Sequence, residues 1–457
     1  MFTYIKLKNY KSFRNVELNL CNKKGIPRNI VLLYGENGCG KSNLVNVFYT
    51  LSQFFRTMQV KDIIDDIISN RTNEIEDIES FKEFLKSNLK ETEAIIKESK
   101  TINSTENMEI ELGFNINGLS GSYYIETNNS QIIHEKLNFV KTKNKTNYFD
   151  IISLPNSEPK FTLNSNIILD KFFLSDTLKN IRKYAGKHSL LSILLYESKD
   201  KQASYFKSAI SDNFHNVLHE LFNISCLIRL NNYTQTETGG ILNPIIRKLD
   251  DGIISVSKKT ELLNIEKALN IYFKNIVRDF ISVEYRFENT NQEGNLHYSL
   301  YLNRYIGNEI ISIPFEYESS GISSLLNLLP YFLDLFQGCT VIIDEMDRGI
   351  HDILFENMLN ILKDNNNGQL ILTLHNTNIM ENPDLRDNVY FIITNKDKTK
   401  EIKNVNDFNR RLYKSNNLKD LYFNSTYGAL PIDNQLNLAT IIDIIYNSNP
   451  NKLKETE

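Results

Sequence analysis

The stretch Gly35-Glu36-Asn37-Gly38-Cys39-Gly40-Lys41-Ser42 decides the fold of this chain. It matches the phosphate-binding pattern G-x-x-x-x-G-K-S/T, in which glycines let backbone N–H groups approach a polyphosphate. In this pattern Lys41 supplies a positive charge for the β- and γ-phosphates, and Ser42 supplies a hydroxyl ligand to Mg²⁺. The stretch therefore predicts a nucleotide site, and the alternative is a glycine-rich turn that binds nothing.

The residues on either side of this stretch support the first interpretation. Residues 30–34 form a short apolar run that is typical of a buried parallel strand, and residues 43–48 can open a helix. The positive end of that helix would point at the phosphates. We therefore predict a strand, a phosphate loop and a helix in this order.

The bulk composition is that of a soluble globular protein. The chain has 457 residues, of which 41% are hydrophobic and 24% charged, enough for a large core and two or three sub-domains. No apolar stretch reaches the ~18 residues that cross a bilayer, and the N-terminus lacks the apolar segment of a secretory signal. We therefore expect a cytoplasmic protein without a membrane partner.

The cysteines, histidines and net charge exclude several other classes. The four cysteines form no C-x-x-C pair, which argues against a zinc ribbon, a redox motif and a disulfide framework. His215 and His219 could share one helix face, but without a third ligand they are expected to be ordinary histidines. The net charge of −4 includes no long block of one sign, so nucleic-acid binding is permitted but not indicated.

Patterns of alternation and helical spacing divide the rest of the chain. Alternating apolar residues predict two strands within residues 2–20, and apolar residues at helical spacing indicate a helix within residues 60–100. We expect six segments: an N-terminal lobe with the phosphate loop (1–57), a helical insertion (58–105), a β-rich arm (106–164), a second, largely helical insertion (165–285), a C-terminal lobe (286–400) and a tail (401–457).

A second informative region lies in the C-terminal lobe. The apolar strand 341–343 ends in Asp344 and Glu345, of which Asp344 can hold Mg²⁺ through water and Glu345 can orient and deprotonate an attacking water. His375 ends the next strand and can hydrogen-bond a γ-phosphate or that water. An exposed acidic turn and a structural histidine are the alternatives, and the phosphate loop favours the functional interpretation.

A further phosphate-binding element precedes the acidic strand. Residues 318–322, Glu-Ser-Ser-Gly-Ile, stand at the start of an apolar helix that extends to about residue 336 and contains Pro330. A helix N-terminus with a small serine–glycine turn is suited to bind phosphate.

The order of these motifs resembles the ABC/SMC-type ATPase head, which is also seen in the RecF repair protein. The resemblance implies an α/β fold with a mixed sheet lobe, a helical signature lobe, a helical insertion and a short C-terminal α/β tail. It also implies ATP and Mg²⁺ as ligands and two heads that sandwich two ATP molecules. The signature here is ESSGI rather than LSGGQ, no Q-loop glutamine is placed, and a long coiled coil is missing.

The resemblance implies a role for each matching residue. The residues that would bind ATP are Gly35, Asn37, Gly38, Gly40, Lys41, Ser42 and Asn43, with Lys11 and Ser12 as further nucleotide contacts. Ser42 and Asp344 would hold the metal, Glu345 and His375 would be catalytic, and Asp347 would lie in the D-loop. The signature residues that would contact ATP of the opposite subunit are Ser319, Ser320 and Gly321.

A narrower resemblance covers residues 319–322, 328–330, 344–351, 374–378, 385–386 and 427–431. These segments are similar to the stand-alone AAA-type ATPases of bacterial antiphage defence, OLD-like proteins without the TOPRIM nuclease, such as RloA and the AriA subunit of PARIS. Membership would imply a homodimer or larger homo-oligomer that hydrolyses ATP, senses infection and controls a separately encoded effector, a nuclease or another toxin. The alternative is a RecF-like DNA-binding ATPase in repair or recombination.

Overall fold

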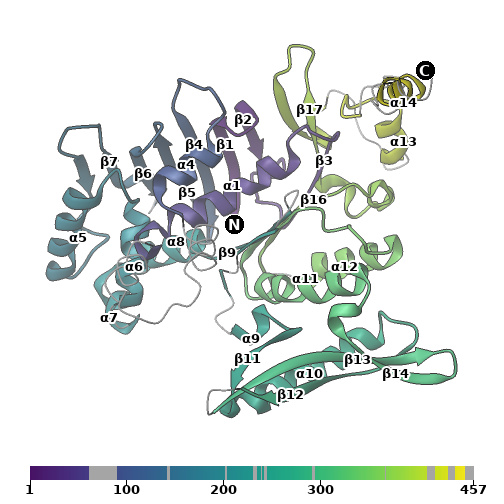
Figure 1. Ribbon diagram of the computed structural model, residues 1–457. Coiled ribbons are helices and arrows are strands. Elements are labelled where there is room, and N and C mark those ends of the chain that lie inside the picture. Colours follow the sequence, from purple (N-terminus) through teal and green to yellow (C-terminus); the bar gives the residue numbers. More distant parts are fainter. Residues whose placement is uncertain are drawn as a thin grey trace, which may run out of the picture.

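The computed structural model describes residues 1–60, 90–140, 145–200, 203–229, 234–237, 239–240, 244–290, 294–365, 367–408, 417–430 and 438–447. Three β-sheets with helices between them form the molecule, and Figure 1 shows them as successive layers. Among the described residues, no helix combines the length and the apolar character that crossing a bilayer requires.

The first sheet is antiparallel and has seven strands in the order β2-β1-β4-β5-β6-β7-β8. Its strands are β1 (Phe2–Tyr10), β2 (Phe13–Asn19), β4 (Met108–Ile116), β5 (Leu119–Thr127), β6 (Ile132–Val140), β7 (Lys145–Ile152) and β8 (Lys160–Leu163). The predicted strand pair within residues 2–20 is confirmed, and its connection places Asn9 and Lys11 at φ values of 50° and 46°.

The second sheet carries the phosphate loop and has the order β10-β9-β15-β16-β3-β17-β18. Its strands are β3 (Ile30–Tyr34), β9 (Ile224–Arg229), β10 (Thr234–Glu237), β15 (Thr340–Ile343), β16 (Gln369–Thr373), β17 (Val389–Thr394) and β18 (Lys400–Asn404). The five central strands are parallel, and the two edge strands are antiparallel. The carboxyl ends of β3, β15 and β16 therefore meet at one edge of the sheet, where α/β proteins bind ligands.

Two strands of this sheet come from the segment predicted to be largely helical, residues 165–285. The prediction is right for the helices up to Phe222. It is wrong for β9 and β10 and for the strands that follow them from Asp251 onward. β9 is a short run with five of six residues fully buried, and periodicity cannot distinguish such a run from a buried helical turn. Its strand conformation is imposed by parallel pairing with β15.

Helix α1 (Lys41–Phe54) lies between the two large sheets, and most of its residues are buried (Figure 1). Further helices pack against the first sheet: α4 (Thr92–Ser99), α5 (Lys171–Tyr184), α6 (Leu190–Asp200), α7 (Ala203–Ala209) and α8 (Asp212–Phe222). The residues at helical spacing from Ile75 to Leu89 lie outside the described part of the chain.

The opposite face of the mixed sheet is covered by α11 (Ser320–Phe336) and α12 (Asp352–Asn365), which share one apolar core with β3, β15 and β16. The first of these helices was predicted, and Pro330 lies inside α11. Near the C-terminus follow α13 (Leu418–Phe423) and α14 (Leu438–Asn447). The predicted α/β head fold, a mixed sheet lobe with a helical lobe that begins at the signature serines, is confirmed.

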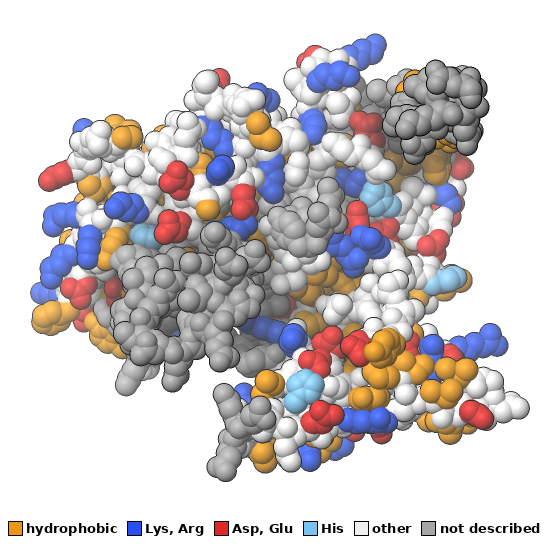
Figure 2. All heavy atoms as spheres, in the orientation of Figure 1, with side chains coloured by type: hydrophobic (Ala, Val, Ile, Leu, Met, Phe, Trp, Pro, Cys, Tyr) orange, Lys and Arg blue, Asp and Glu red, His pale blue; other side chains and the backbone are white. Residues whose placement is uncertain are grey.

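The third sheet packs against α11 through Leu326 and forms a separate core with α10. It contains β11 (Asp251–Ser255), β12 (Phe280–Asn289), β13 (Asn295–Ile306) and β14 (Glu309–Pro314), with α9 (Pro244–Arg247) and α10 (Lys259–Lys274) beside them. Figure 2 shows apolar side chains gathered over β13 and β14, where Tyr305, Ile306 and Ile310 are exposed.

Candidate functional site

The phosphate loop joins β3 to α1, and its last glycine cannot be replaced without distortion. Gly40 has φ 109° at the start of the helix, a left-handed conformation that favours glycine. A Cβ at this position would lie 2.8 Å from the Ser12 Oγ and 2.9 Å from the Phe13 ring. The loop backbone and the β1–β2 turn therefore approach each other closely here.

Lys41 is held inside its own loop. Its Nζ donates hydrogen bonds to the carbonyl oxygens of Gly35, at 2.7 Å, and Glu36, at 3.2 Å, and the residue is only 7% exposed. The ammonium group thus lies at the centre of the curved loop, at the positive end of α1. In this position it can exchange the two carbonyl oxygens for phosphate oxygens.

The two further nucleotide contacts expected from the N-terminal strands lie in different surroundings. The Ser12 Oγ accepts a hydrogen bond of 3.0 Å from Asn43 Nδ2 beside the loop. The Lys11 side chain instead lines a small cavity with Tyr49 and Glu98 on the flank of α1 that faces α4, and burial lowers the pKa of Lys11 to about 8. Of the two residues, Ser12 is the one that the structure brings to the phosphate loop.

Asp344 follows β15 and is fully buried at the carboxyl edge of the sheet. Its Oδ1 accepts a hydrogen bond of 2.5 Å from Thr373 Oγ1, and its Oδ2 has no hydrogen-bond partner among the described residues. Burial raises the pKa of Asp344, and the nearby hydroxyls of Thr373 and Ser42 oppose that shift. A buried carboxylate oxygen without a partner beside a serine hydroxyl fits an oxygen-liganded cation such as Mg²⁺.

Glu345 has an unusual backbone conformation, with φ 50°, which is uncommon for a residue other than glycine and is concentrated at functional sites. The Thr373 hydroxyl accepts a hydrogen bond of 2.8 Å from the Glu345 N–H, so one threonine fixes both acidic residues. The Glu345 carboxylate is one-third exposed and lies 3.8 Å from His375 Nε2 and 3.5 Å from Arg348 Nη1. The carboxylate therefore borders the solvent side of the site.

Asp347 connects the loop after β15 to the loop after β16. Its Oδ2 accepts hydrogen bonds from the backbone N–H groups of His375, at 2.8 Å, and Asn376, at 2.5 Å. A displacement of one loop would thus be transmitted to the other. The sequence placed Asp347 and His375 in two different motifs, and the structure joins them.

The signature serines stand at the exposed N-terminus of α11. Ser319 caps this helix, with its Oγ accepting from the Ile322 N–H at 3.4 Å, and both Ser319 and Ser320 are exposed. Gly321 packs directly against the loop after Asp347, because a Cβ there would lie 2.5 Å from the Gly349 carbonyl oxygen. The glycine therefore has a packing role within the chain.

Three residues near the site have no local sequence signal. Thr373 is an ordinary strand residue, and its importance follows only from its contacts with Asp344 and Glu345. Arg229 ends β9 beside these carboxylates, which oppose the lowering of its pKa by burial and by Arg348. Lys400 starts β18, with Nζ 5.1 Å from the Phe13 ring centroid and 3.3 Å from the Cβ position of Gly40.

The two histidines at helical spacing lie on α8, away from these elements. His219 contacts Asn223 of the same turn. Within the described ranges there is no group of three or more His, Cys, Asp or Glu side chains placed to hold a metal ion.

A glycine-rich loop at the N-terminus of a buried helix, next to two carboxylates at the end of a parallel strand, defines a P-loop nucleotide-binding protein. Residues 1–380 match the family model AAA_15, described as "AAA ATPase domain", and the chain belongs to this ATPase family. A search among curated proteins gave no match.

Several solved structures are similar to this chain. The SMC head domain from Thermotoga maritima is 15% identical with a TM-score of 0.35, and the comparison covers 88% of this chain and 98% of that one. An Smc head with the C-terminal domain of ScpA, derived from Pyrococcus furiosus, is 12% identical (TM-score 0.37, 88% and 96% covered). The recombination mediator RecF with ATP is 12% identical (TM-score 0.33, 82% and 93% covered). These values describe distant similarities.

Proposed function

We propose that this chain hydrolyses ATP with Mg²⁺ and that its complete site forms between two copies of the chain. The observation that carries the proposal is Asp344, a fully buried carboxylate beside Ser42 at the N-terminus of α1, whose Oδ2 accepts no hydrogen bond from the part of the chain that the structure describes. Such an arrangement is expected where a cation bridges the protein and a polyphosphate.

The residues of one copy divide the work of phosphoryl transfer. Lys41 releases the carbonyl oxygens of its loop and donates to the β- and γ-phosphates of ATP, and the loop N–H groups bind the same oxygens. Ser42 and Asp344 hold Mg²⁺, which neutralises phosphate charge when it is bound. Glu345 orients the attacking water and accepts its proton.

His375 and Asp347 adjust the position of this base. The His375 ring lies 3.8 Å from the Glu345 carboxylate, within reach of a bridging water or a γ-phosphate oxygen. Asp347 accepts a hydrogen bond from the backbone N–H of His375. A movement of His375 when the γ-phosphate is lost would therefore also move the loop that contains Asp347. Both residues would thus act at the γ-phosphate end of the site.

The second copy supplies Ser319, Ser320 and the N–H groups of the α11 N-terminus to the γ-phosphate. The exposure of both serines at the end of a 17-residue helix supports this role, because such an end favours a bound anion. Closure of a homodimer, or of a larger homo-oligomer, is then driven by the higher affinity of ATP for the closed state.

We further propose that this ATPase is the sensor and scaffold of an antiphage defence system and controls a separately encoded effector. Support comes from the resemblance of residues 344–351 and 427–431 to OLD-like ATPases. The later segment is integral to the ATPase, because the Tyr427 ring stacks on Phe391 of β17 at 4.8 Å. A motif packed against the central sheet in this way is suited to transmit the nucleotide state outward.

The test is Glu345→Gln, analysed by light scattering with and without ATP and Mg²⁺. We expect ATP binding to persist, turnover to fall by about 10²–10⁴-fold because the general base is lost, and a closed dimer to accumulate. Glu17→Gln, at an exposed surface glutamate, is the matched control and should behave as the original protein. Normal turnover in Glu345→Gln would remove Glu345 from this role.

The biological part is tested with the product of the neighbouring open reading frame. We expect this product to copurify with Glu345→Gln in a manner that depends on ATP. Failure to copurify, together with DNA binding whose affinity falls steeply with salt concentration, would favour the RecF-like alternative instead.

A further inference from the structure

Arg229 is the last residue of β9, which lies next to the acidic strand β15 in the mixed sheet. The two strands are parallel, with Leu227 opposite Ile343, and the Asp344 N–H continues the pairing by donating to the Leu227 carbonyl oxygen at 2.8 Å. Extending this register by two residues places Arg229 level with Glu345. The arginine therefore stands at the carboxyl edge of the sheet, where parallel sheets bind their ligands.

Charged side chains surround the Arg229 guanidinium, yet none of them pairs with it. Burial and the neighbouring Arg348 lower the pKa of Arg229. The carboxylates of Glu345, Asp344 and Asp347, which follow β15, oppose this shift. Arg348 is exposed, and its Nη1 lies 3.5 Å from the Glu345 carboxylate. Arg229 is half-buried, and no ion pair or hydrogen bond joins its guanidinium to another residue in the described part of the chain.

A half-buried guanidinium without a partner is costly to the free protein. Arginine stays protonated in proteins and carries five N–H donors. These donors lose hydration on burial, and the loss is offset only when acceptors replace the water. The Arg229 side chain therefore fits an anion that binds at this edge of the sheet and is not part of the chain.

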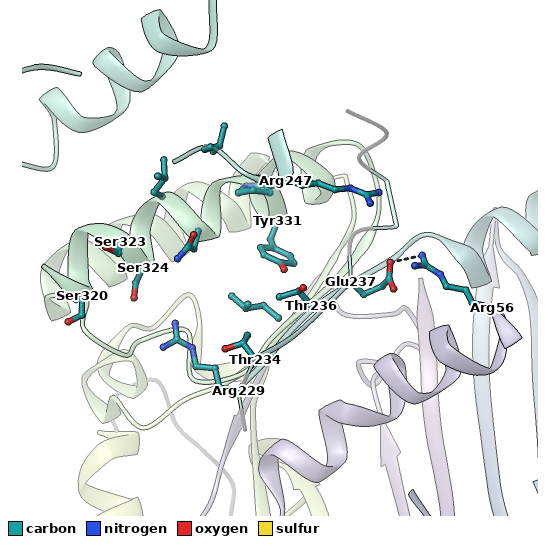
Figure 3. A pocket seen from close by; sticks show the side chains of 15 residues that line it. Arg56, Arg229, Thr234, Thr236, Glu237, Arg247, Ser320, Ser323, Ser324 and Tyr331 are labelled. Carbon is teal, nitrogen blue, oxygen red and sulfur yellow. Dashed lines mark ion pairs between the residues drawn. The ribbon is translucent and has the colours of Figure 1, made fainter. Parts of the chain in front are cut away.

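The Arg229 side chain extends from the sheet toward the first turns of α11. Figure 3 shows it on the side of Ser320 and Ser324, in the cavity between β9, β10 and α11. Arg247 lies at the opposite end of the same cavity, with Tyr331 between the two arginines. Arg229 thus occupies the end that borders the nucleotide site, and Arg247 occupies the far end.

The proposed reaction needs positive charge at this end. Water attacks the γ-phosphorus and gives its proton to Glu345, while the bond from that phosphorus to the β,γ-bridging oxygen breaks and its electron pair stays on ADP. Negative charge is then spread over the transferring group and the leaving oxygen, so preorganised cationic donors lower the barrier. Lys41 donates to the phosphates from the loop, whereas Arg229 stands on the side of Glu345.

We propose that Arg229 is a further catalytic residue of the ATPase, an inference that rests on the proposed function. Its guanidinium donates hydrogen bonds to the γ-phosphate oxygens of the ATP bound to the same chain, and it exchanges no proton. The carboxylates after β15 hold the arginine near this position before ATP arrives. Because the contact strengthens as the phosphoryl group is transferred, it accelerates the chemical step more than it tightens ATP binding.

The test is ATPase kinetics on Arg229→Gln, with Arg247→Gln as the matched control that removes the same charge at the far end of the cavity. We expect kcat of Arg229→Gln to fall about 10³-fold, while the Kd for ATP changes by less than about tenfold. Binding of ADP with aluminium fluoride, which imitates the transferring phosphoryl group, should weaken in parallel with kcat. Arg247→Gln should behave as the original protein in all three measurements.

A second variant separates catalysis from folding. Arg229→Lys keeps the charge but loses the planar fork of donors, so its kcat should lie between those of Arg229→Gln and the original protein. Both variants should have the melting temperature of the original protein. If the two variants instead lost stability and kept the kcat of the original protein in their folded fraction, Arg229 would have only a structural role.

Mixing Arg229→Gln with Lys41→Ala shows which nucleotide the arginine serves. If Arg229 acts on the ATP of its own chain, neither site of a mixed dimer is complete and the mixture stays inactive. Recovered activity would assign Arg229 to the partner's ATP and overturn the inference. An Arg229→Gln variant with unchanged kcat would also overturn it, and a slow Glu345→Gln variant beside it would leave the proposed ATPase function intact. An original protein without ATPase activity would remove both.

Discussion

Two parts of this molecule are built in opposite ways: the phosphate-loop half, with Gly35–Ser42 and Asp344, and the signature half, at the N-terminus of α11. The first is enclosed: Lys41 and Asp344 are buried, and the lysine is bound by its own loop. The second ends at the surface, where Ser319 and Ser320 are exposed. Under the proposed function, this difference means that the first half would bind phosphate within one chain, whereas the second half would act on the ATP of another copy.

Among the four variants that compare the two halves, the largest effect is expected for Lys41→Ala in the enclosed half. Loss of the central ammonium group should lower kcat/KM for ATP by about 10²–10³-fold, as for other preorganised donors. Lys23→Ala, an exposed lysine in the turn after β2, should leave the steady-state ATPase rate unchanged. Equal rates for both variants would show that the enclosed lysine does not bind phosphate.

Thr373→Val tests whether the positions of Asp344 and Glu345 depend on the hydroxyl of Thr373. The variant leaves Asp344 Oδ1 without its donor and the Glu345 N–H without its acceptor. We expect a loss of about 1–3 kcal/mol in the free energy of unfolding and a lower kcat. Denaturant unfolding measures the first quantity. If stability and kcat were unchanged, the threonine would not organise the two acids.

Gly321→Ala tests the packing of the signature half within one chain. The new methyl group would meet the Gly349 carbonyl oxygen at 2.5 Å, so the loop after Asp347 must move. We expect this to lower the free energy of unfolding by about 1–3 kcal/mol. Thermal unfolding of the nucleotide-free protein should therefore reveal the change. An unaltered melting temperature would contradict the close approach of these two glycines.

Ser320→Glu is expected to be the mildest change in a single chain, because the residue is exposed. Stability should stay within about 0.5 kcal/mol, and one head should bind ATP as before. Dimerisation driven by ATP should weaken about tenfold or more, because the new carboxylate faces the γ-phosphate of the partner. Analytical ultracentrifugation with ATP measures this, and undiminished dimerisation would refute a role of Ser320 across the subunits.

The structure also explains why part of the site could be predicted and part could not. The loop Gly35–Ser42 was predictable because its chemistry is contiguous and its glycines have a local conformational reason. Asp344 and Glu345 were predictable because an apolar strand precedes them. Lys400 and Thr373 were not, because each reaches the site only through its neighbours in the sheet.

By itself the sequence determined the phosphate loop, the strand and helix around it, the acidic strand end and the serine-capped helix, since each depends on residues close together in the chain. Only the tertiary structure decided that β9 joins the central sheet, that Lys11 turns toward α4, and that Gly321 rests on the D-loop. Strand pairing and close backbone approach join segments hundreds of residues apart. Local spacing does not record which distant segments will meet, because those contacts are selected by packing of the whole core.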